Sequence, residues 1–439
     1  MILQKKSEIE AFYKTIKLGK SRSKPSVISA IVQRINHVYK MFSTNACLYV
    51  YTDGYYMELE KEIFKKIIMN LFITGRYVYS NREGSDAYSQ MRTICSVTDI
   101  DKKMNNYPDL IPFKNGYFNI KTNKFEACRK SVYFTTHLPF DYNKSPKCPL
   151  FKRTVEEILP NKDDRDYLLT YIKYCFSSSI ERGIALILYG ESGENGKTSL
   201  IEYFLSMLGD LATPFDFHAL SKDSGTITST NGKFFALASE IGRTGFLEVS
   251  TQERIKNMIT DSHLSGRGAY QVQQNWINTT KYIFTTNRFP KLADPQRAFF
   301  RRFKIIEFTQ IFTDDSTIKK DRTRFKRIMD TENGDVLSWI LQNYSDISIL
   351  TTDWKEIKEF WIDKSSPVKR FVEDCCEVKY IGVIEDTTSD MYEAFVDWCG
   401  DQDVNVIKMD TFKKNMKKLG HRTEQIEGKT WIYKGVKLL

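Results

Sequence analysis

The stretch LILYGESGENGKTSLIEYF, residues 186–204, sets a glycine-rich loop between a continuous apolar run and a helical pattern. A loop of this kind between a strand and a helix is typical of phosphate sites. Its backbone N–H groups converge on the phosphate oxygens, and the helix N-terminus attracts negative charge. The usual spacing is a glycine, four residues and then Gly-Lys-Ser/Thr. Here five residues separate Gly190 from Gly196, so the loop is one residue longer than usual.

The residue types in this loop favour ATP and Mg²⁺ as cofactors. Glycines allow close approach of the backbone and positive φ angles. Lys197 can reach the terminal phosphates, and the Thr198 hydroxyl can ligate Mg²⁺. The predicted nucleotide contacts are Gly190, Gly193, Asn195, Gly196, Lys197, Thr198 and Ser199. The alternative is a glycine-rich turn with a chance lysine, and the extra residue counts in its favour.

A second candidate element is the acid that ends the apolar run KFFALASE, residues 233–240. Glu240 comes one helix after the phosphate loop, where it could polarise the attacking water and hold the metal with its water shell. Ordinary versions of this element have two acids, so Ser239 is a departure that leaves one carboxylate for both tasks. Taken alone, a glutamate at a strand end is more often an ordinary surface residue.

Two further polar elements flank the next apolar runs. Asn287 ends YIFTTN and could orient water against the γ-phosphate, although asparagine at a strand end is also a common turn former. Arg301 and Arg302 precede the run FKIIEF. An arginine beside the γ-phosphate raises the rate by orders of magnitude and can come from a neighbouring subunit. The competing interpretation is a pair of solvated arginines.

Composition narrows the class of protein. The chain has 439 residues, a net charge of +10 and a pI near 8.9, which favours an anionic partner such as nucleic acid. The eight cysteines include no Cys-x-x-Cys pair, so free thiols in a reducing compartment are expected. No apolar run approaches the ~18 residues of a membrane span, and the N-terminus has no signal-peptide core. The expected location is the cytoplasm, that of the host if a phage or plasmid encodes the chain.

The pattern along the chain predicts an α/β fold. Four apolar runs of strand length alternate with helical patterns, which is typical of a parallel sheet buried on both faces. Asn115-Gly116 predicts a hairpin turn between two aromatic runs. The predicted regions are 1–109, mixed α/β; 110–180, a hairpin plus helices; 181–315, the P-loop ATPase; 316–366, a helical connector; and 367–439, a winged-helix-like DNA-binding domain.

Taken together, these motifs resemble those of superfamily 3 helicases of the phage, plasmid and poxvirus type. The similar elements are FKNGYFNIKT, LPFDYNKSPKCPLF, NGKTS, ASE, TTNRFP and AFFRRFKIIEF, and they occur in the family's order from about Asp109 to Leu439. The resemblance implies an AAA+-like ATPase that forms a ring, often a hexamer, and unwinds DNA during replication. Relatives are usually fused to a primase or primase-polymerase, so a fused or separate enzyme of that kind is an expected partner.

The resemblance also implies roles for single residues. Lys197 and Thr198 hold phosphate and Mg²⁺, Glu240 is the second acidic motif and a further metal contact, and Asn287 is the sensor. Arg302 is the arginine finger because it directly precedes the final apolar strand, and Arg301 is the second choice. The longer phosphate loop leaves open how Gly190 and Gly193 wrap the nucleotide.

Two segments are candidates for DNA contact. Between Asp261 and Thr280, the family implies a hairpin that projects into the ring channel, with Arg267 and Tyr270 as its DNA contacts. Near the C-terminus, residues 405–439 hold nine Lys/Arg against three Asp/Glu. The lysines at 413, 414, 417 and 418 share one broad helical face, which suits contact with phosphates. An ordinary surface hairpin and a solvated lysine face are the alternatives.

The resulting hypothesis is a replicative DNA helicase that hydrolyses ATP at subunit interfaces of a homo-oligomeric ring, on single-stranded or forked DNA. Residues 1–110 show no convincing paired-acid primase or polymerase centre, so a collar or DNA-entry domain is expected there. One alternative is a P-loop kinase acting on a small molecule. The other is a non-motor loader or clamp that binds ATP and DNA but hydrolyses little.

Overall fold

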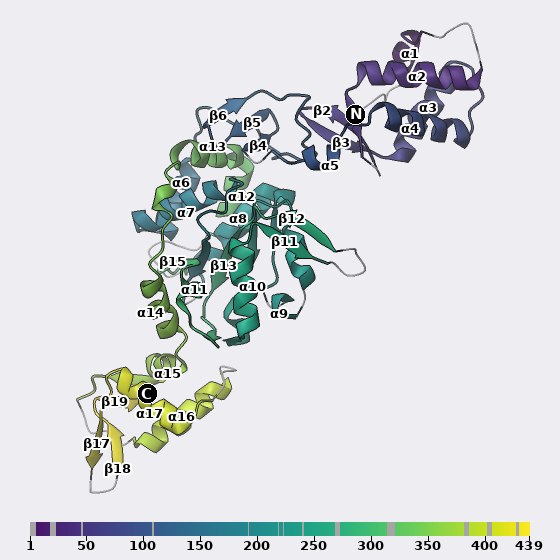
Figure 1. The fold of residues 1–439 in the computed structure, drawn as a ribbon. Coiled ribbons are helices and arrows are strands. Elements are labelled where there is room, and N and C mark those ends of the chain that lie inside the picture. The colour runs from purple at the N-terminus through teal and green to yellow at the C-terminus, as the bar shows by residue number, and fades with distance from the viewer. Residues whose placement is uncertain are drawn as a thin grey trace.

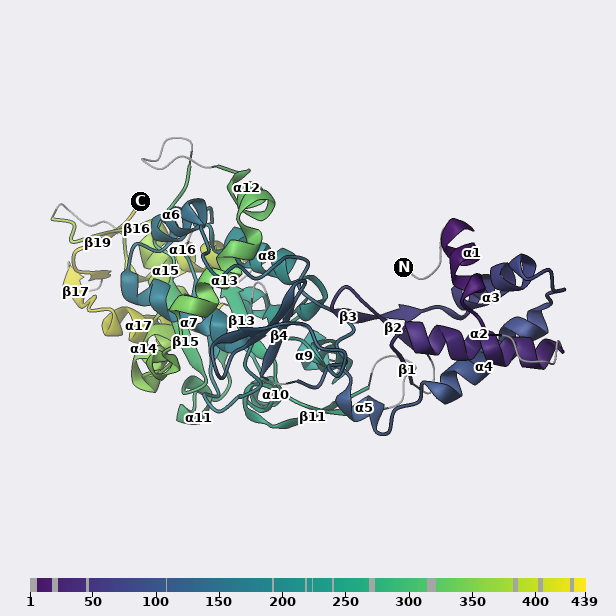
Figure 2. The ribbon, with the colours of Figure 1, turned by 90° about the horizontal axis from the view of Figure 1, so that it is seen from above.

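The chain forms an elongated series of packed regions around a central α/β core (Figures 1 and 2). The computed structural model describes residues 6–17, 23–44, 47–107, 109–191, 193–217, 219–222, 224–238, 241–267, 273–313, 321–381, 386–401, 406–426 and 430–439.

The N-terminal region is mixed α/β, with helices packed beside a small antiparallel sheet. Its elements are α1 (Lys6–Lys14), α2 (Lys24–Val38), β1 (Met41–Ser43), β2 (Leu48–Thr52), β3 (Tyr55–Leu59), α3 (Lys61–Thr74), α4 (Asn81–Ile94) and α5 (Ile100–Lys103). Strands β1, β2 and β3 pair in chain order. The apolar faces of α1 to α4 and inward residues of the strands form one hydrophobic core.

A second antiparallel sheet connects this region to the centre of the molecule. It consists of β4 (Leu110–Phe113), β5 (Gly116–Asn119) and β6 (Lys124–Glu126). Phe113 pairs with Gly116, so the predicted hairpin is present, with Lys114 and Asn115 as its turn residues and Gly116 as the first residue of β5. A Cβ at Gly116 would lie 2.4 Å from the carbonyl oxygen of Glu126, which explains the need for glycine at the start of the strand.

The central sheet has five parallel strands in the order β15-β7-β13-β9-β8. They are β7 (Ala185–Tyr189), β8 (Ala212–Pro214), β9 (Phe235–Ala238), β13 (Lys281–Thr286) and β15 (Phe303–Glu307). Along the fully buried β7, Leu186 and Leu188 enter one hydrophobic core, while Ala185, Ile187 and Tyr189 enter the other. This two-residue alternation is what a strand covered on both faces requires, and it confirms the predicted buried parallel sheet.

Helices cover both faces of this sheet (Figure 1). The core that contains Leu186 also takes residues of α6 (Pro149–Ile158), α7 (Lys162–Cys175), α8 (Lys197–Leu208), α12 (Arg324–Thr331) and α13 (Asn333–Asn343). The core that contains Ile187 takes residues of α10 (Val249–Thr260), α11 (Arg297–Phe300) and α14 (Trp354–Lys364). Hydrophobic packing thus joins the central sheet to helices that come before residue 181 and after residue 315 in the sequence.

Short elements complete the central region. They are η1 (Gly209–Leu211), α9 (Ala219–Lys222), η2 (Ser224–Thr230), η3 (Ile241–Thr244), β10 (Phe246–Leu247), β11 (His263–Gly266), β12 (Gln274–Ile277), β14 (Lys291–Leu292) and η4 (Ile347–Ile349).

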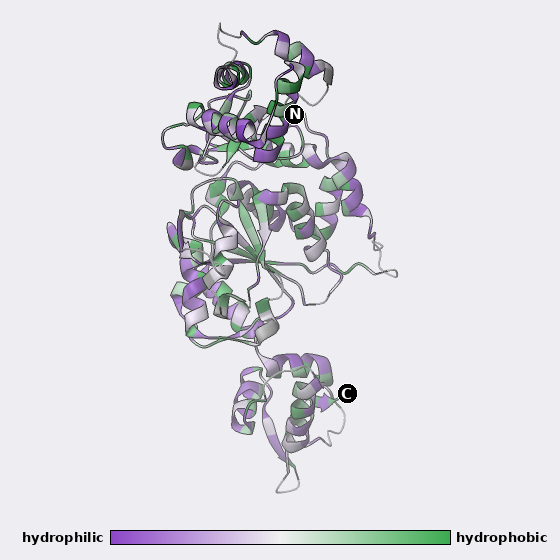
Figure 3. Cartoon of the chain, turned by 90° about the vertical axis from the view of Figure 1, so that its right-hand side faces the viewer, coloured by the Kyte–Doolittle hydropathy of each residue, from purple (hydrophilic) through white to green (hydrophobic). Residues whose placement is uncertain are grey.

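The C-terminal module has a hydrophobic core of its own and lies at the end of the molecule opposite the N-terminal helices (Figure 3). Its elements are α15 (Pro367–Cys375), β16 (Cys376–Val378), α16 (Thr388–Asp401), α17 (Met409–Lys418), β17 (Thr423–Ile426), β18 (Thr430–Tyr433) and β19 (Val436–Leu438). Strand β16 pairs with β19, and β17 forms a hairpin with β18.

Two global features accompany the fold. All eight cysteines are free, and burial raises the pKa of Cys148, Cys175 and Cys376 to about 12, so these thiols stay protonated near neutral pH. In the part of the chain that the structure describes, no helix combines the length and apolar character needed to cross a bilayer.

Candidate nucleotide and DNA sites

The central candidate site lies where β7 and β13 end side by side. The two strands are parallel, and Tyr189 pairs with Thr286, so Gly190 and Asn287 follow at the same edge of the sheet. Lys197, the first residue of α8, donates a hydrogen bond to Asn287 Oδ1. Carboxyl edges of parallel sheets are where such folds bind ligands. The structure therefore brings together a loop lysine and a sensor candidate that are 90 residues apart.

Lys197 is enclosed although it carries a charge. Only 2% of the residue is exposed, and its Nζ also lies 3.4 Å from both the Gly190 carbonyl oxygen and Asn195 Oδ1. A buried ammonium needs such oxygens because removing it from water is costly. These contacts hold the ammonium group between the glycine-rich loop and the end of β13. Thr198 and Ser199 follow on the exposed start of α8.

The glycines of the loop are not equivalent. A Cβ at Gly190 would lie 1.9 Å from Asn195 Nδ2, and Gly196 adopts a left-handed φ of 80° with Ile158 close by. At Gly193 a Cβ would meet no atom within 4 Å. Glu194 is also left-handed, with a φ of 60°. Within the longer loop, therefore, the backbone requires glycine at 190 and 196 but shows no such need at 193.

This difference gives a matched pair of variants. Gly190→Ala should displace Asn195 and lower the free energy of unfolding by about 1–3 kcal/mol, with a loss of nucleotide affinity. Gly193→Ala should change the free energy of unfolding by less than about 0.5 kcal/mol. Urea unfolding and titration with a fluorescent ATP analogue measure both effects. Equal stability of the two variants would contradict the close contact between Gly190 and Asn195.

A cavity of about 470 Å³ adjoins the same loop. Its lining combines apolar side chains with polar groups and includes Ile158, Gly196, Ser199, Phe312 and Phe325. The Phe312 N–H donates to the Glu194 carbonyl oxygen at 2.8 Å, which ties this wall to the phosphate loop. The Phe325 ring lies 5.6 Å from the Tyr203 ring of α8. An apolar cleft beside a phosphate loop suits the nucleoside part of a nucleotide.

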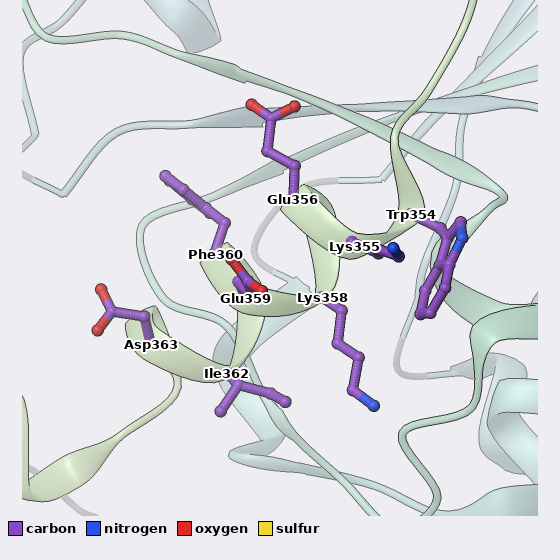
Figure 4. A pocket seen from close by; sticks show the side chains of 8 residues that line it. All are labelled: Trp354, Lys355, Glu356, Lys358, Glu359, Phe360, Ile362 and Asp363. Atoms are coloured by element: carbon purple, nitrogen blue, oxygen red, sulfur yellow. The ribbon is translucent and has the colours of Figure 1, made fainter. Parts of the chain in front are cut away.

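A larger cavity of about 820 Å³ runs along α14 (Figure 4). Its lining comes from that helix alone, and acids and bases alternate along it, from Lys355 and Glu356 to Asp363. Figure 4 shows these side chains pointing in different directions rather than converging. Of these two cavities, only the smaller is lined by residues of the glycine-rich loop, so it is the better candidate for a nucleotide site.

The C-terminal end of α14 nevertheless reaches the phosphate loop. Lys364 Nζ lies 3.2 Å from a carboxylate oxygen of Glu191 and 5.6 Å from the centre of the Tyr189 ring. Sequence reasoning missed this contact, because 173 positions separate the two residues and no local pattern marks Lys364. The ion pair links Glu191, the residue after Gly190, to α14, the helix that leads into the C-terminal module.

Arg302 lies at the opposite edge of the sheet from Lys197. It precedes β15, and its carbonyl oxygen accepts a hydrogen bond from the N–H of Ala185 at the start of β7. A strand of this length spans roughly 15 Å, so Arg302 is out of reach of its own phosphate loop. Its Nε is buried and has no hydrogen-bond partner among the described residues, and burial lowers the pKa of its guanidinium, with Arg301 adding to the effect. Arg301 is exposed.

The predicted hairpin before the sensor strand is present. Strands β11 and β12 pair antiparallel, with His263 opposite Ile277 and Gly266 opposite Gln274, and the hairpin projects from the core (Figure 1). Buried Leu264 and Trp276 face each other near its base, which anchors it to the core. Arg267 is exposed next to Gly266 at the far end of β11.

Some predicted residues lie outside the described part of the chain. These are Tyr270 at the hairpin and Ser239 with Glu240 after β9. Strand β9 ends at Ala238, beside β13, so the described backbone leads to the same sheet edge as Asn287.

The C-terminal lysines share an exposed face, as the helical spacing predicted. Lys413, Lys414, Lys417 and Lys418 are all exposed on α17. Phe412 and Met416 are buried on the other side of the helix, in the core of the module. The basic face is therefore free of packing contacts with that core.

Comparisons with known proteins agree with the motif pattern. The family D5_N, described as "D5 N terminal like", matches residues 21–160. The family DUF5906, described as a family of unknown function, matches residues 188–302, from the phosphate loop to Arg302. "Putative helicase L207/L206" of Acanthamoeba polyphaga mimivirus is 20% identical over 359 residues, which cover 70% of this chain and 36% of that protein. The chain thus spans little more than a third of this relative's length.

Solved structures show a weaker likeness. "The A form apo structure of NrS-1 C terminal region-CTR" has a TM-score of 0.47 and 11% identity, covering 91% of this chain and 97% of that one. "The apo structure of NrS-1 C terminal region" has a TM-score of 0.48 and 12% identity, covering 95% and 100%. The two family matches and the helicase relative, in contrast, fit a chain of the phage and viral primase-helicase type, as the ordered motifs predicted.

Proposed function

We propose that the chain is an ATP-driven DNA helicase motor acting in replication. The observation that carries this proposal is the contact of Lys197 with Asn287 across the adjacent ends of β7 and β13. It joins the loop that would bind phosphate to a polar side chain that would sense the terminal phosphate. The helicase relative and the D5-like region favour DNA as the partner.

The loop residues fit ATP and Mg²⁺. Lys197 would contact the terminal phosphates, and the exposed Thr198 hydroxyl would ligate the metal. Bound ATP supplies the phosphoanhydride bond whose hydrolysis releases the energy. Asn287 would orient the attacking water, and Glu240 would polarise it and share the metal with Thr198, as the family resemblance implies.

Hydrolysis would take place between subunits of an AAA+-like ring of the superfamily 3 type, with six subunits as the expected number. Arg302 lies at the sheet edge remote from its own loop, so an adjacent subunit is the site that it could serve. Its buried Nε has no hydrogen-bond partner among the described residues, which is consistent with a partner that an adjacent subunit or its nucleotide supplies on assembly. The β11–β12 hairpin, with Arg267 and Tyr270, would then move along DNA in the central channel.

The C-terminal module would add DNA affinity. Its order of helix, strand, two helices and hairpin supports the proposed winged-helix assignment, and α17 presents four exposed lysines. Contact with phosphate backbone is the function that fits this face.

The deciding experiment is steady-state ATP hydrolysis by the full chain with and without single-stranded DNA. A motor should be stimulated by DNA, whereas a small-molecule kinase should turn over ATP without regard to it. A loader or clamp should bind both ligands and show little turnover in either condition. No stimulation in an assembled sample would rule out the motor.

The cavity beside the loop gives a separate prediction. Phe325→Ala removes an aromatic wall of the proposed nucleoside site, so KM for ATP should rise about 5- to 100-fold, the range expected for loss of base stacking. The kcat should change little, because the phosphate contacts remain. Asp330→Ala, an exposed change on the same helix α12, is the matched control. An unchanged KM with Phe325→Ala would place the base elsewhere.

A further inference from the structure

The hairpin of the C-terminal module carries an exposed tryptophan. Trp431, on β18, is 48% exposed, whereas Trp276, Trp361 and Trp398 are buried and the other two are half-buried. A single exposed apolar side chain is common on protein surfaces and indicates nothing by itself. Its position relative to α17 and the charges around it are what give it meaning.

Strand register places Trp431 on the α17 side of the hairpin. Trp431 pairs with Gln425, and Tyr433 pairs with Thr423. Side chains two positions apart share one face of a strand, so Trp431 and Tyr433 point the same way. Tyr433 is 1% exposed, and its ring lies 6.3 Å from Phe412 of α17. Trp431 therefore lies on the same face of β18 as Tyr433, which packs on α17. It is two residues away from Tyr433 and outside the hydrophobic core.

On α17 and the described strands of the hairpin, basic side chains outnumber acids, and on its other side β18 bridges Thr387, the neighbour of the acid Asp386. The exposed lysines of α17 are joined by Arg422 and Lys434, whose backbones are hydrogen-bonded at 2.9 Å across the base of the hairpin. In the described residues from 406 onward, Asp410 and Glu424 are the acids, and Glu424 lies 3.4 Å from Lys434. Basic groups with an exposed aromatic ring suit a partner that offers both phosphates and the faces of bases.

We propose that α17 and the β17–β18 hairpin bind DNA that has unpaired bases, with the lysines on phosphates and Trp431 stacked on a base. In a duplex the bases are already stacked on each other, so Trp431 gains a partner only at a single strand or a fork. The module would then recognise where strands separate, rather than duplex DNA in general. This inference rests on the proposed DNA-dependent motor, and because its tests measure DNA binding and not ATP turnover, failure of one proposal can be told from failure of the other.

The test uses the full chain without nucleotide, and a readout local to Trp431. Binding of a single-stranded oligonucleotide should quench tryptophan fluorescence in the wild type, and Trp431→Phe should remove most of that quenching while keeping affinity within about threefold. Trp354→Phe, on α14, is the matched control and should leave the quenching unchanged. The phenylalanine variant keeps an aromatic ring, so it separates stacking from folding.

Affinity measurements complete the test. Trp431→Ala should weaken binding of single-stranded and forked DNA about 5- to 100-fold without altering its salt dependence, and blunt duplex binding should stay the same. Lys413→Ala and Lys417→Ala should instead weaken all three DNAs and each lower the salt slope by about 0.7–0.9.

Three results would overturn the inference. One is Trp431→Ala with wild-type affinity for every DNA, and another is equal weakening for single strands and blunt duplex. The third is a Trp431 fluorescence change that follows protein concentration without DNA, which would identify a contact between copies. If DNA still stimulates ATP hydrolysis in these cases, the motor proposal stands and only the role of Trp431 is lost.

Discussion

Lys197→Ala is expected to lower DNA-stimulated ATP turnover by roughly 10²–10³-fold, the usual effect of removing a charged donor from developing phosphate charge. The structure shows why one side chain should matter so much. Its ammonium is the buried cation at the point where the Gly190 carbonyl, Asn195 and Asn287 meet. A coupled ATPase assay over a range of ATP concentrations measures the loss.

Controls for this prediction address folding and charge. Lys197→Ala leaves oxygens without their cation, so circular dichroism and thermal unfolding should confirm that the variant is folded. Lys162→Ala removes an exposed lysine, paired with Asp166 on α7, and should keep wild-type activity. A folded Lys197→Ala variant with more than about a tenth of wild-type turnover would contradict the phosphate role of Lys197.

Arg302→Ala is expected to lower kcat by about 10³–10⁵-fold while ATP still binds, if it acts as a finger in trans. Mixing it with Lys197→Ala subunits should restore activity, because each variant supplies what the other lacks. In equal mixtures roughly one interface in four has both intact residues, so recovery near a quarter of wild-type turnover is expected. Mixed assemblies and each variant alone are compared in the same ATPase assay.

Arg301→Ala is the matched variant in this experiment, since Arg301 is the exposed neighbour and Arg302 is partly buried. A much larger loss with Arg301→Ala than with Arg302→Ala would move the finger to Arg301. Activity that survives both single changes would remove the trans role from this pair. Failure of the mixture to recover any activity would indicate that both residues serve the same subunit or that Arg302 supports the fold.

Local pattern was sufficient for the secondary structure that positions the site. The apolar runs at β7, β9, β13 and β15 were readable because strands buried on both faces lack polar alternation. The Asn115-Gly116 hairpin and the lysine face of α17 were also readable, since turn chemistry and helical spacing act over a few residues. Each of these features depends on neighbours in the sequence.

Several features of the site required the fold. The pairing of Lys364 with Glu191 and the cavity wall from Phe325 depend on helices α14 and α12 packing back onto the sheet. The unequal roles of the glycines also appeared only in three dimensions. Gly193 fits the motif but has open space around it, whereas Gly190 is confined by Asn195.

The sequence by itself determined that the chain has a glycine-rich loop between a strand and a helix, a buried parallel sheet and a set of motifs in the order typical of the helicase family. Those properties can be read from the sequence because they depend on the spacing of nearby residues and on continuous apolar runs, both of which involve only neighbours in the chain. Only the tertiary structure decided that β13 lies against β7, which puts Asn287 on Lys197, and that Arg302 lies at the far edge of the sheet. Strand order and long-range packing make these choices, because no local pattern specifies which strand becomes a neighbour.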